Sequence, residues 1–468
     1  MEEKDLVVIG GGPAGYVAAI RASQLGGKVT LIEYDALGGT CLNRGCVPSK
    51  TLLHSVELYQ KMKEAEQYGI KTTGVSADLA KMMARKSAVI STHVSGVQSL
   101  LKGNQVEVIK GRARLAPSMQ VEIDSGQGQK QTVQAKKIIV ATGGKPITLP
   151  IPGADSPSGV ISAESILALD HIPKSILIIG GGVIGVEMGT ILAKLGSQVT
   201  LVEMLPHILP LEDAELTTTL SKALKDDGVE VYEGTKVSEI EDAKGGKSIT
   251  VSDGKTGKKL EAEVVAIAVG YRPNTDDIGL EKAGITVSKG AIQVNEHMAT
   301  NIPDIYAAGD AIGGMMLAYV AMEEGVIAAE NALGKDSTID YRAVPKCTFT
   351  LPEVASVGIT EEEAIKQGYQ IRVGRFPFAA NSMATILGER RGLVKIITDQ
   401  KYGQILGVHI IGPKATELIA EATLAMKLEV TTEEIIATVH SHPSLSEAVR
   451  EAALDVTGET IHFPSKNR

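Results

Sequence analysis

One unit occurs twice in this sequence, and it restricts the fold more than any other feature. Residues 6–33 and 176–203 align without a gap at an offset of 170 residues (176 − 6). Each copy has an aliphatic run, a Gly-x-Gly-x-x-Gly pattern, an apolar stretch and a second aliphatic run that ends in an acid. An offset this long is not that of a solenoid. The repeat predicts two separate nucleotide-binding domains, each built from a strand, a helix and a strand.

The glycines and the final acid of each copy suit a dinucleotide. Glycine lets the backbone approach a pyrophosphate at a helix N-terminus, and the acid accepts a hydrogen bond from a ribose hydroxyl. A glycine-rich turn without a ligand is the alternative, which the flanking strands and helix disfavour. Two such sites imply two cofactors, or one cofactor and a dinucleotide substrate. The residues are Gly10, Gly12, Gly15 and Glu33 in the first copy, and Gly180, Gly182, Gly185 and Glu203 in the second.

Two cysteines, Cys41 and Cys46, follow the first copy at short range. A dithiol this close to a cofactor site can pass electrons to the cofactor, and a helix N-terminus would favour its thiolate form. Buried structural cysteines and half of a zinc site are the alternatives. Zinc needs further ligands at matching spacing, and the remaining cysteine, Cys347, is far away in the sequence. We therefore predict a redox pair and no metal site.

The cysteine pair indicates which site binds which cofactor. A flavin can accept electrons from a dithiol, whereas nicotinamide has no usual route to accept them directly from sulfur. The first site is therefore predicted to bind FAD and the second a nicotinamide dinucleotide. The acid Glu203 favours the free 2′-hydroxyl of NAD over the 2′-phosphate of NADP, and no arginine pair follows it.

Charge and composition restrict partners and location. A net charge of −9 argues against nucleic acid or an anionic membrane as the main partner. The most apolar charge-free runs are too short to cross a bilayer. The first residues are acidic, without the basic region of a signal peptide. Three cysteines in a long chain suit a reducing cytosol, so we expect a cytoplasmic protein.

Between and beyond the two copies, the sequence predicts an α/β fold with an α+β C-terminal region. Long helices are expected within residues 56–101, short strands within 106–135, and an exposed hairpin turn over 244–259. A proline-rich linker is expected over 146–153. The predicted domains are an FAD-binding domain (1–145), an NAD-binding domain (146–273), a central domain completing the FAD site (274–342) and an interface domain (343–468).

Two further polar residues each have a structural and a functional interpretation. Asp310 ends an apolar run and could contact a ribityl or ribose hydroxyl, although Asp is also a frequent turn and cap residue. The two upstream repeats favour contact with the cofactor. His442 precedes a Ser444-x-x-Glu447 pattern. Spacing alone favours a capping box that opens a helix over 445–454, rather than a general base oriented by Glu447.

Together these motifs resemble the pyridine nucleotide-disulfide oxidoreductases, a family of flavoproteins. The resemblance covers essentially the whole chain and is greatest to the branch that oxidises dihydrolipoamide and reduces NAD. The motifs that carry it are both glycine loops, residues 39–50, residues 141–143, residues 305–310 and His442-Pro443 with Glu447.

The resemblance implies a homodimer in which His442 and Glu447 serve the active site of the partner subunit, and it reverses the preference for a capping role. It also implies partners: lipoyl domains, and the acyltransferase core of a 2-oxo-acid dehydrogenase complex or a glycine cleavage complex. An assembly subunit with incidental chemistry is the rival from another class. The intact Cys41, Cys46 and His442 disfavour that rival.

The family pattern assigns roles to single residues. The substrate thiolate would attack Cys41, and Cys46 would lie beside the flavin ring. Lys50 would lie near the flavin and pair with Glu187, although an ordinary helix lysine and a polar helix position are the alternatives. The implied FAD contacts are Gly10, Gly12, Gly15, Glu33, Gly39, Thr40, Cys41, Lys50, Gly111, Ala113, Thr142, Gly143, Gly309, Asp310, Met316, Leu317 and Ala318. The implied NAD contacts are Gly180, Gly182, Val183, Ile184, Gly185, Glu187, Glu203, Val237 and Gly270.

The chain departs from the family pattern at few positions. Few other members of the family are rival identifications. Relatives often have His where this chain has Tyr319, and they vary at Arg44 between the cysteines. Glutathione- and trypanothione-type reductases would use NADP, which Glu203 disfavours. Mercuric and large thioredoxin reductases would carry C-terminal cysteines, and residues 461–468 contain none.

Overall fold

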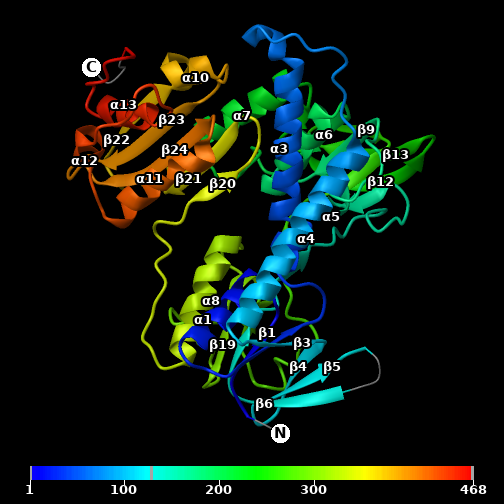
Figure 1. The fold of residues 1–468 in the computed structure, drawn as a ribbon. Helices are drawn as coiled ribbons and strands as arrows, with labels where there is room; N and C mark the ends of the chain where they lie inside the picture. The colour runs from blue at the N-terminus through cyan, green and yellow to red at the C-terminus, as the bar shows by residue number, and fades with distance from the viewer. Residues whose placement is uncertain (1–2, 127–129, 465–468) are drawn as a thin grey trace. The chain divides into compact units, whose positions relative to one another are not determined.

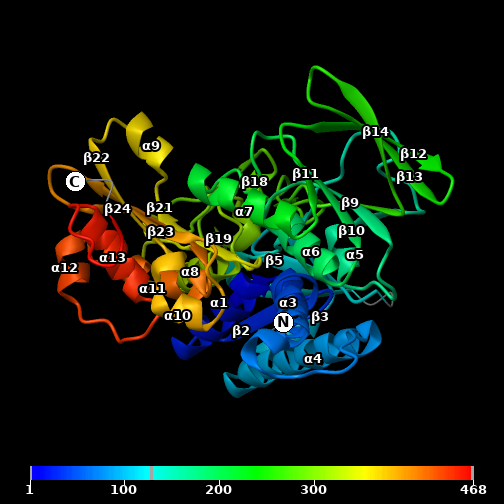
Figure 2. The ribbon, with the colours of Figure 1, turned by 90° about the horizontal axis from the view of Figure 1, so that it is seen from above.

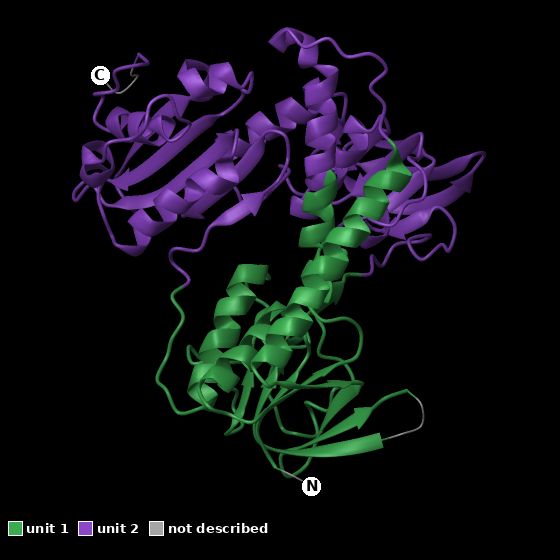
Figure 3. Ribbon diagram, in the orientation of Figure 1, with its two compact units in different colours: residues 1–52, 78–147, 270–340 green, residues 53–77, 148–269, 341–468 purple. Residues whose placement is uncertain are grey.

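The computed structural model describes residues 3–126 and 130–464. The chain forms two compact units, and each is assembled from three separate segments (Figure 3). The first unit contains residues 1–52, 78–147 and 270–340, and the second contains residues 53–77, 148–269 and 341–468. The four-domain boundaries expected from the sequence remain a prediction.

A seven-stranded sheet forms the centre of the first unit (Figure 1). Its strand order is β3-β2-β1-β6-β5-β4, and β19 pairs with β6. The strands around β1 are parallel, and β4, β5 and β6 form an antiparallel extension. Their bounds are β1 Lys4–Ile9, β2 Val29–Glu33, β3 Glu107–Lys110, β4 Arg112–Ala116, β5 Gln120–Asp124, β6 Lys130–Val140 and β19 Ile305–Ala307.

Alternating aliphatic residues of β1 explain why this sheet is buried on both faces. Leu6 and Val8 pack with α1, α4 and α8 on one side, whereas Val7 and Ile9 pack with the antiparallel extension and residues 278–292 on the other. The helices α1 and α8 lie side by side (Figure 1). The helices of this unit are α1 Pro13–Gln24, α2 Gly39–Arg44, α4 Leu79–Gly103, η2 Gly309–Ile312 and α8 Ala318–Ala332, and α3 Cys46–Lys63 begins in it.

Two small antiparallel pairs complete the first unit. β7 pairs with β16, and β17 pairs with β18. Their bounds are β7 Gly144–Pro146, β16 Tyr271–Pro273, β17 Val287–Ser288 and β18 Ala291–Ile292.

The second unit contains a parallel five-stranded sheet of order β11-β10-β9-β15-β8. The antiparallel sheet β12-β13-β14 packs against it through aliphatic residues (Figure 2). The strands are β8 Val160–Ser162, β9 Ser175–Ile179, β10 Gln198–Val202, β11 Glu230–Tyr232, β12 Lys236–Ala243, β13 Gly246–Ser252, β14 Gly257–Ala262 and β15 Val264–Ile267. The helices here are α5 Ala163–Ile166, α6 Val183–Lys194 and α7 Ala214–Asp226, and η1 Ala65–Tyr68 precedes them in the chain.

The C-terminal part of the second unit is an antiparallel sheet of order β20-β21-β24-β23-β22. One face packs against α11 and α13, as Figure 1 shows. The strands are β20 Lys346–Thr348, β21 Glu353–Gly358, β22 Ile371–Pro377, β23 Leu393–Asp399 and β24 Ile405–Gly412. The helices are α9 Glu361–Lys366, η3 Phe378–Ala380, α10 Ser382–Ile386, α11 Ala415–Lys427, α12 Thr432–Ala437 and α13 Glu447–Asp455.

Both predicted strand-helix-strand units are present, and the mixed α/β class is confirmed. Two local predictions are wrong. Residues 244–259 contain most of β13 and the start of β14, because alternate residues of β13 reach the core, so the stretch is not only a turn. The last helix begins at Glu447 and not at residue 445. Residues 127–129, within the stretch 106–135 where short strands are predicted, lie outside the described residues.

Candidate functional site

The two glycine loops have nearly the same backbone geometry. The Gly10 N–H donates to the Ile32 carbonyl at 2.8 Å, and the Gly180 N–H donates to the Val202 carbonyl at 2.8 Å. The helices α1 and α6 begin directly after Gly12 and Gly182, and neither N-cap has a side-chain hydrogen bond. The first N–H groups of both helices are therefore available to an anion, as a pyrophosphate site requires.

The outer glycines of each loop are required by close packing. A Cβ atom added at Gly15 would lie 1.8 Å from the Gly10 carbonyl oxygen, and one added at Gly185 would lie 1.9 Å from the Gly180 carbonyl oxygen. Each helix therefore lies too close to its loop for any side chain at these positions.

The middle glycines instead face open space. A Cβ at Gly12 would meet only the Gly39 Cα, at 3.8 Å, and a Cβ at Gly182 would have no heavy atom within 4 Å. Packing therefore does not require a glycine at either position, but the approach of a phosphate group to the backbone does. Both loops fit a bound dinucleotide.

The predicted ribose acids are buried beside the loops. Glu33 accepts hydrogen bonds from the N–H groups of Gly11 and Asp35, both at 2.6 Å. Glu203 repeats this arrangement with the corresponding N–H groups, at 2.6 and 2.7 Å. A carboxylate has about four lone-pair positions, so each acid can also accept from a ribose hydroxyl.

Thr142 lies against the first glycine loop at Gly10, and Asp310 lies beside Gly144, two residues further along the chain from Thr142. Asp310 follows β19 directly in η2, and burial raises the pKa of its carboxyl group. A Cβ at Gly144 would lie 2.9 Å from Asp310 Oδ2, so this carboxylate adjoins the glycine turn at Gly143. The buried hydroxyl of Thr142 has no hydrogen-bond partner among the described residues. An unpartnered hydroxyl beside a desolvated carboxyl group fits a ligand rich in hydroxyls and phosphates, as FAD is.

The remaining predicted FAD contacts are distributed around the same unit. The Gly111 N–H donates to the Glu33 carbonyl at 3.0 Å, and the Gly309 N–H donates to Glu324 Oε2 at 2.8 Å. The others in the first unit are Gly39, Thr40, Lys50, Ala113, Met316, Leu317 and Ala318. Their contact with a flavin stays a prediction.

The two cysteines lie next to each other. Cys41 is in the short helix α2 and is half-buried, whereas Cys46 is exposed and is the first residue of α3. A hydrogen bond between the two sulfur groups raises the pKa of Cys41 above its ordinary range, and burial adds to this rise, while the Lys50 ammonium group opposes it. Burial thus disfavours the thiolate form of Cys41, whereas Cys46 is exposed at a helix N-terminus, where a thiolate is stabilised.

Two residues near the cysteines were missed by the sequence analysis. The Asn43 side chain donates to the carbonyls of Leu37 and Gly39 at 3.0 and 2.9 Å, so it ties α2 to the preceding loop. Tyr16 lies on α1, and burial together with the Cys41 charge raises the pKa of its hydroxyl. Asn43 lies within the cysteine motif and could have been noticed, whereas the position of Tyr16 depends on tertiary packing.

His442 and Glu447 form a pair in the second unit. His442 Nδ1 lies 2.9 Å from Glu447 Oε1, and the Ser444 N–H donates to Glu447 Oε2 at 2.9 Å. Burial alone would raise the pKa of Glu447, but the Ser444 N–H and His442 hold it below its usual value. Glu447 thus accepts from the Ser444 N–H and orients an exposed imidazole. The predicted capping box does not form, because α13 begins at Glu447 and its N-cap, Ser446, makes no side-chain cap hydrogen bond.

Three other predicted residues have clear surroundings. Glu187 is buried on α6 and accepts from the Phe349 N–H at 3.0 Å. Val237 packs its side chain into the core, so only its backbone could contact NAD. Gly270 belongs to the first unit, whereas the other predicted NAD contacts belong to the second. The Lys50–Glu187 pair joins residues of different units and stays a prediction.

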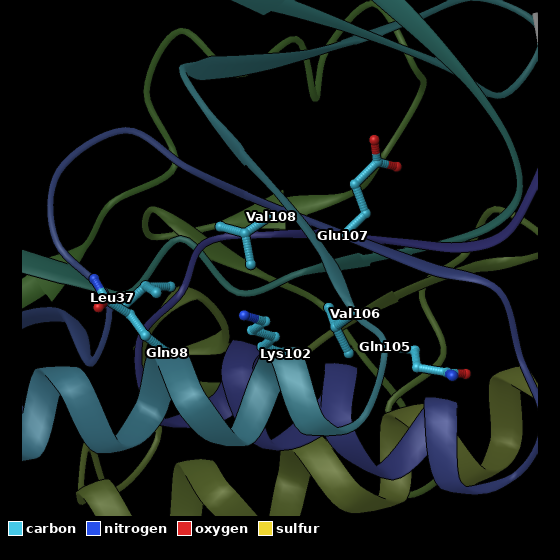
Figure 4. A pocket seen from close by; sticks show the side chains of 7 residues that line it. All are labelled: Leu37, Gln98, Lys102, Gln105, Val106, Glu107 and Val108. Atoms are coloured by element: carbon cyan, nitrogen blue, oxygen red, sulfur yellow. The ribbon is translucent and has the colours of Figure 1, made fainter.

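A surface cavity of about 550 Å³ lies beside β3 (Figure 4). Its lining residues are Leu37, Gln98, Lys102, Gln105, Val106, Glu107 and Val108. Within the described ranges, no group of acids, histidines and cysteines could hold a metal ion, and no helix is long and apolar enough to span a membrane.

Comparison with known proteins agrees with this geometry. A dihydrolipoyl dehydrogenase of Bacillus subtilis is 42% identical over 98% of this chain and 99% of its own length. Among solved structures, LpdA of Mycobacterium tuberculosis superposes with a TM-score of 0.88 at 30% identity, covering 97% of this chain and 99% of that one. The HOCl-induced flavoprotein disulfide reductase RclA of Escherichia coli, in its Cu(II) complex, has a TM-score of 0.87 at 29% identity, with the same coverage.

Two family descriptions match nearly the whole chain. Residues 4–325 match the family described as pyridine nucleotide-disulphide oxidoreductase, and residues 344–453 match the dimerisation domain of that family. The first match includes both glycine loops and both redox cysteines. The chain belongs to the pyridine nucleotide-disulphide oxidoreductase family.

Proposed function

We propose that this chain is an FAD-dependent dihydrolipoyl dehydrogenase, which oxidises dihydrolipoamide and reduces NAD⁺ to NADH. One observation carries the proposal: the sulfur groups of Cys41 and Cys46 lie side by side directly after the first of two equivalent dinucleotide loops. The relatives named dihydrolipoyl dehydrogenase support it, because their similarity extends over nearly the full length of both chains.

The cofactors follow from the two loops. Bound FAD would accept two electrons from a dithiol and pass them to NAD as a hydride. Gly12 would leave room for the FAD pyrophosphate, while Gly10 and Gly15 let the helix lie close to the loop. Glu33 and Asp310 would accept hydrogen bonds from the hydroxyl groups of FAD. The second loop holds NAD in the same manner through Glu203, whose charge repels a 2′-phosphate.

The disulfide chemistry balances without another reactant. One substrate thiolate attacks the sulfur of Cys41, the Cys41–Cys46 bond breaks, and Cys46 leaves as a thiolate. The second substrate thiolate then attacks the mixed disulfide, so that oxidised lipoamide leaves and Cys41 regains a thiol. Two electrons pass from the substrate to the cysteine pair. The helix start at Cys46 and the raised pKa of Cys41 both favour Cys46 as the sulfur that leaves as a thiolate.

A base is required because few thiols are ionised at neutral pH. We assign this role to His442, whose imidazole is exposed and oriented by the Glu447 carboxylate. The family match to a dimerisation domain supports a homodimer in which this pair serves the cysteines of the partner subunit. In the same arrangement Lys50 and Glu187 would pair beside the flavin.

Physiological partners follow from the substrate. We propose that the homodimer accepts lipoyl domains and binds the acyltransferase core of a 2-oxo-acid dehydrogenase complex, or serves a glycine cleavage complex, in the cytoplasm.

Steady-state kinetics with paired substrates test the proposed function. We expect kcat/KM to be greatest for dihydrolipoamide with NAD⁺, lower for dihydrolipoamide with NADP⁺, and negligible for oxidised glutathione with NADPH. A preference for glutathione and NADPH would overturn the proposal. The cysteine pair would then serve a different disulfide, and Glu203 would not select the nucleotide.

A further inference from the structure

A straight row of polar side chains crosses the C-terminal sheet of the second unit, which has the strand order β20-β21-β24-β23-β22. In the register of the sheet, Lys346 pairs with Ser356, Ser356 with His409, His409 with Lys395, and Lys395 with Arg375. Their strand neighbours pack against α11 and α13, so the row lies on the opposite face of the sheet. Lys395 and His409 are almost completely buried, at 3% and 0% exposure. A buried row of this kind requires partners.

Carboxylates at the starts of α7 and α9 supply partners for Lys395 and Arg375. Lys395 Nζ lies 2.8 Å from both oxygens of Asp213, and 2.7 Å from Glu361 Oε2. Arg375 donates to Glu215 at 2.8 Å and to Glu361 at 3.0 Å. Asp213 is 2% exposed and caps α7 through the Glu215 N–H. Burial alone would raise the pKa of Asp213, but Lys395 lowers it overall, so the pair is ionic.

A strap, defined here as residues 204–212, connects this ionic pair with the second glycine loop. At its far end, Lys346 Nζ donates to the Leu211 carbonyl at 2.9 Å. The Glu212 N–H donates to the Leu209 carbonyl at 2.9 Å, and the Leu209 N–H donates to the Gly181 carbonyl at 2.8 Å. Gly181 is the residue between Gly180 and Gly182.

Close packing makes the same connection. A Cβ atom at Gly181 would lie 2.8 Å from Ile208 Cγ2, and Ile208 and Leu209 are 0% and 2% exposed. The strap is therefore seated on the loop that we assign to the NAD pyrophosphate. Its other end is fixed by the polar row of the sheet that belongs to the dimerisation domain.

We propose that Lys395 is a positioning residue for the nicotinamide dinucleotide site: by holding Asp213 it fixes the strap that supports the glycine loop at Gly181. The inference rests on the proposed function, since it concerns the site assigned there to NAD. It adds that the dimerisation sheet helps to shape a nucleotide site within its own chain.

The physical reason is the high cost of a buried charge without its partner. Removal of the ammonium group leaves Asp213 buried beside Glu361 and Glu215, and repulsion among these carboxylates is relieved most easily if the start of α7 moves outward. Such a movement would pull the strap from Gly181. The glycine loop assigned to FAD and the two cysteines belong to the other unit.

The test is Lys395→Met in the FAD-loaded homodimer, compared with Lys395→Arg and Lys247→Met. Lys247 is the control for loss of a buried lysine, because it is also 3% exposed but lies in the β12–β14 sheet and pairs with an exposed aspartate, Asp242. NADH binding is measured by calorimetry, the KM for NAD⁺ and kcat by steady-state kinetics, and flavin reduction by dihydrolipoamide without NAD⁺ by stopped flow.

We expect Lys395→Met to weaken NADH binding and to raise the KM for NAD⁺ by roughly three- to thirtyfold. Flavin reduction by dihydrolipoamide should keep its wild-type rate, and Lys395→Arg should restore much of the affinity because it keeps the charge. Lys247→Met should lower the melting temperature without changing NADH affinity.

Unchanged NADH affinity in a destabilised Lys395→Met would overturn the inference, because Lys395 would then act only in folding. If wild-type protein binds no NADH, the proposed function fails first, and the two failures are thereby distinguished. Should Lys395→Met not fold, Lys346→Met removes the hydrogen bond to Leu211 and the positive charge near the Glu212 carboxyl group, both of which act on the strap. A smaller loss of NADH affinity in that variant supports the inference, and no loss overturns it.

Discussion

The two glycine loops differ not in themselves but in what the chain builds directly after each. In the first, the Gly38 N–H returns to the Gly11 carbonyl at 2.8 Å, and the helix that carries Cys41 begins at the next residue. In the second, the Leu209 N–H returns to the Gly181 carbonyl at the same distance, and the chain continues to Asp213 and the polar row.

The comparison shows how one binding unit serves two tasks. Both loops leave the same open space for a pyrophosphate and bury the same kind of acid, so each can hold a dinucleotide. The segment that returns to the loop determines the rest. After the first loop it presents a redox pair, and after the second it meets a buried ionic cluster. The loops alone would not reveal which one takes part in sulfur chemistry.

The largest effect should come from a substitution in the cysteine pair that follows the first loop. We expect Cys46→Ser to lower dihydrolipoamide-dependent NADH formation by at least about 10³-fold, because no thiolate can then leave from Cys41. FAD should stay bound, with its visible absorbance intact, since the glycine loop and Glu33 are unchanged. Cys347→Ser is the control and should keep wild-type turnover. Substantial turnover in Cys46→Ser would refute the role of the pair.

The next largest effect concerns the general base for the substrate thiol, a residue that the segment after the first loop does not supply. We expect His442→Gln to lower turnover at neutral pH by about 10²- to 10⁴-fold, because the substrate thiol then has no proton acceptor. Activity of this variant should rise with pH as the substrate ionises by itself, and Glu447→Gln should show a smaller loss. A pH–rate profile for each variant measures this. A His442→Gln variant that is as active as the wild type at pH 7 would contradict the assignment.

The acid sensitivity of the two units should differ because of His409. Burial lowers the pKa of His409 to about 4, whereas an unfolded histidine has a pKa of about 6.5. The unfolded state therefore binds more protons between these values, and stability is lost as pH falls through this window, by up to about 3 kcal/mol.

Urea unfolding and hydrogen exchange between pH 7 and pH 4 would test this difference. Amides of the sheet β20-β21-β24-β23-β22 should lose protection at low pH before those around β1. His409→Gln keeps a donor for the Ile359 carbonyl, which the histidine Nε2 meets at 3.0 Å, and should flatten the pH dependence. If the stability of the His409→Gln variant fell with pH as steeply as that of the wild type, His409 would not be the cause of the acid sensitivity.

The smallest effect should distinguish the role of Glu203 from that of Glu33. We expect Glu203→Ala to narrow the NAD/NADP ratio of kcat/KM by about tenfold, because a single repulsion of the 2′-phosphate is removed. Glu33→Ala should leave that ratio unchanged and weaken retention of FAD, measured by dialysis and absorbance. An unchanged nucleotide ratio in Glu203→Ala would count against its assignment.

Features that are local in the chain could be predicted from the sequence. The strand, glycine loop, helix and acid of each repeat lie within one short stretch, and so do Cys41 and Cys46. The predicted strands and helices near them have their expected positions within a few residues. The hydrogen bond that the Ser444 N–H donates to Glu447 was also foreseeable, although the second acceptor oxygen allows Glu447 to orient His442 as well.

The polar row could not be predicted in the same way. Its five residues come from five strands, and their alignment depends on strand register, which no single segment determines. Lys395 and Asp213 are far apart in the sequence, and each resembles an ordinary surface residue when read alone. Tyr16 is a similar case, because its position near Cys41 depends on how α1 packs.

Anaerobic titration of the FAD-loaded protein with dihydrolipoamide, followed by NAD⁺, tests the central claim most directly. The account predicts a new long-wavelength flavin band as the cysteine pair is reduced, then loss of the band and formation of NADH when NAD⁺ is added, with no response to glutathione. An unaltered flavin spectrum after dihydrolipoamide would contradict it, because the sulfur pair after the first loop would then not exchange electrons with a cofactor held by that loop.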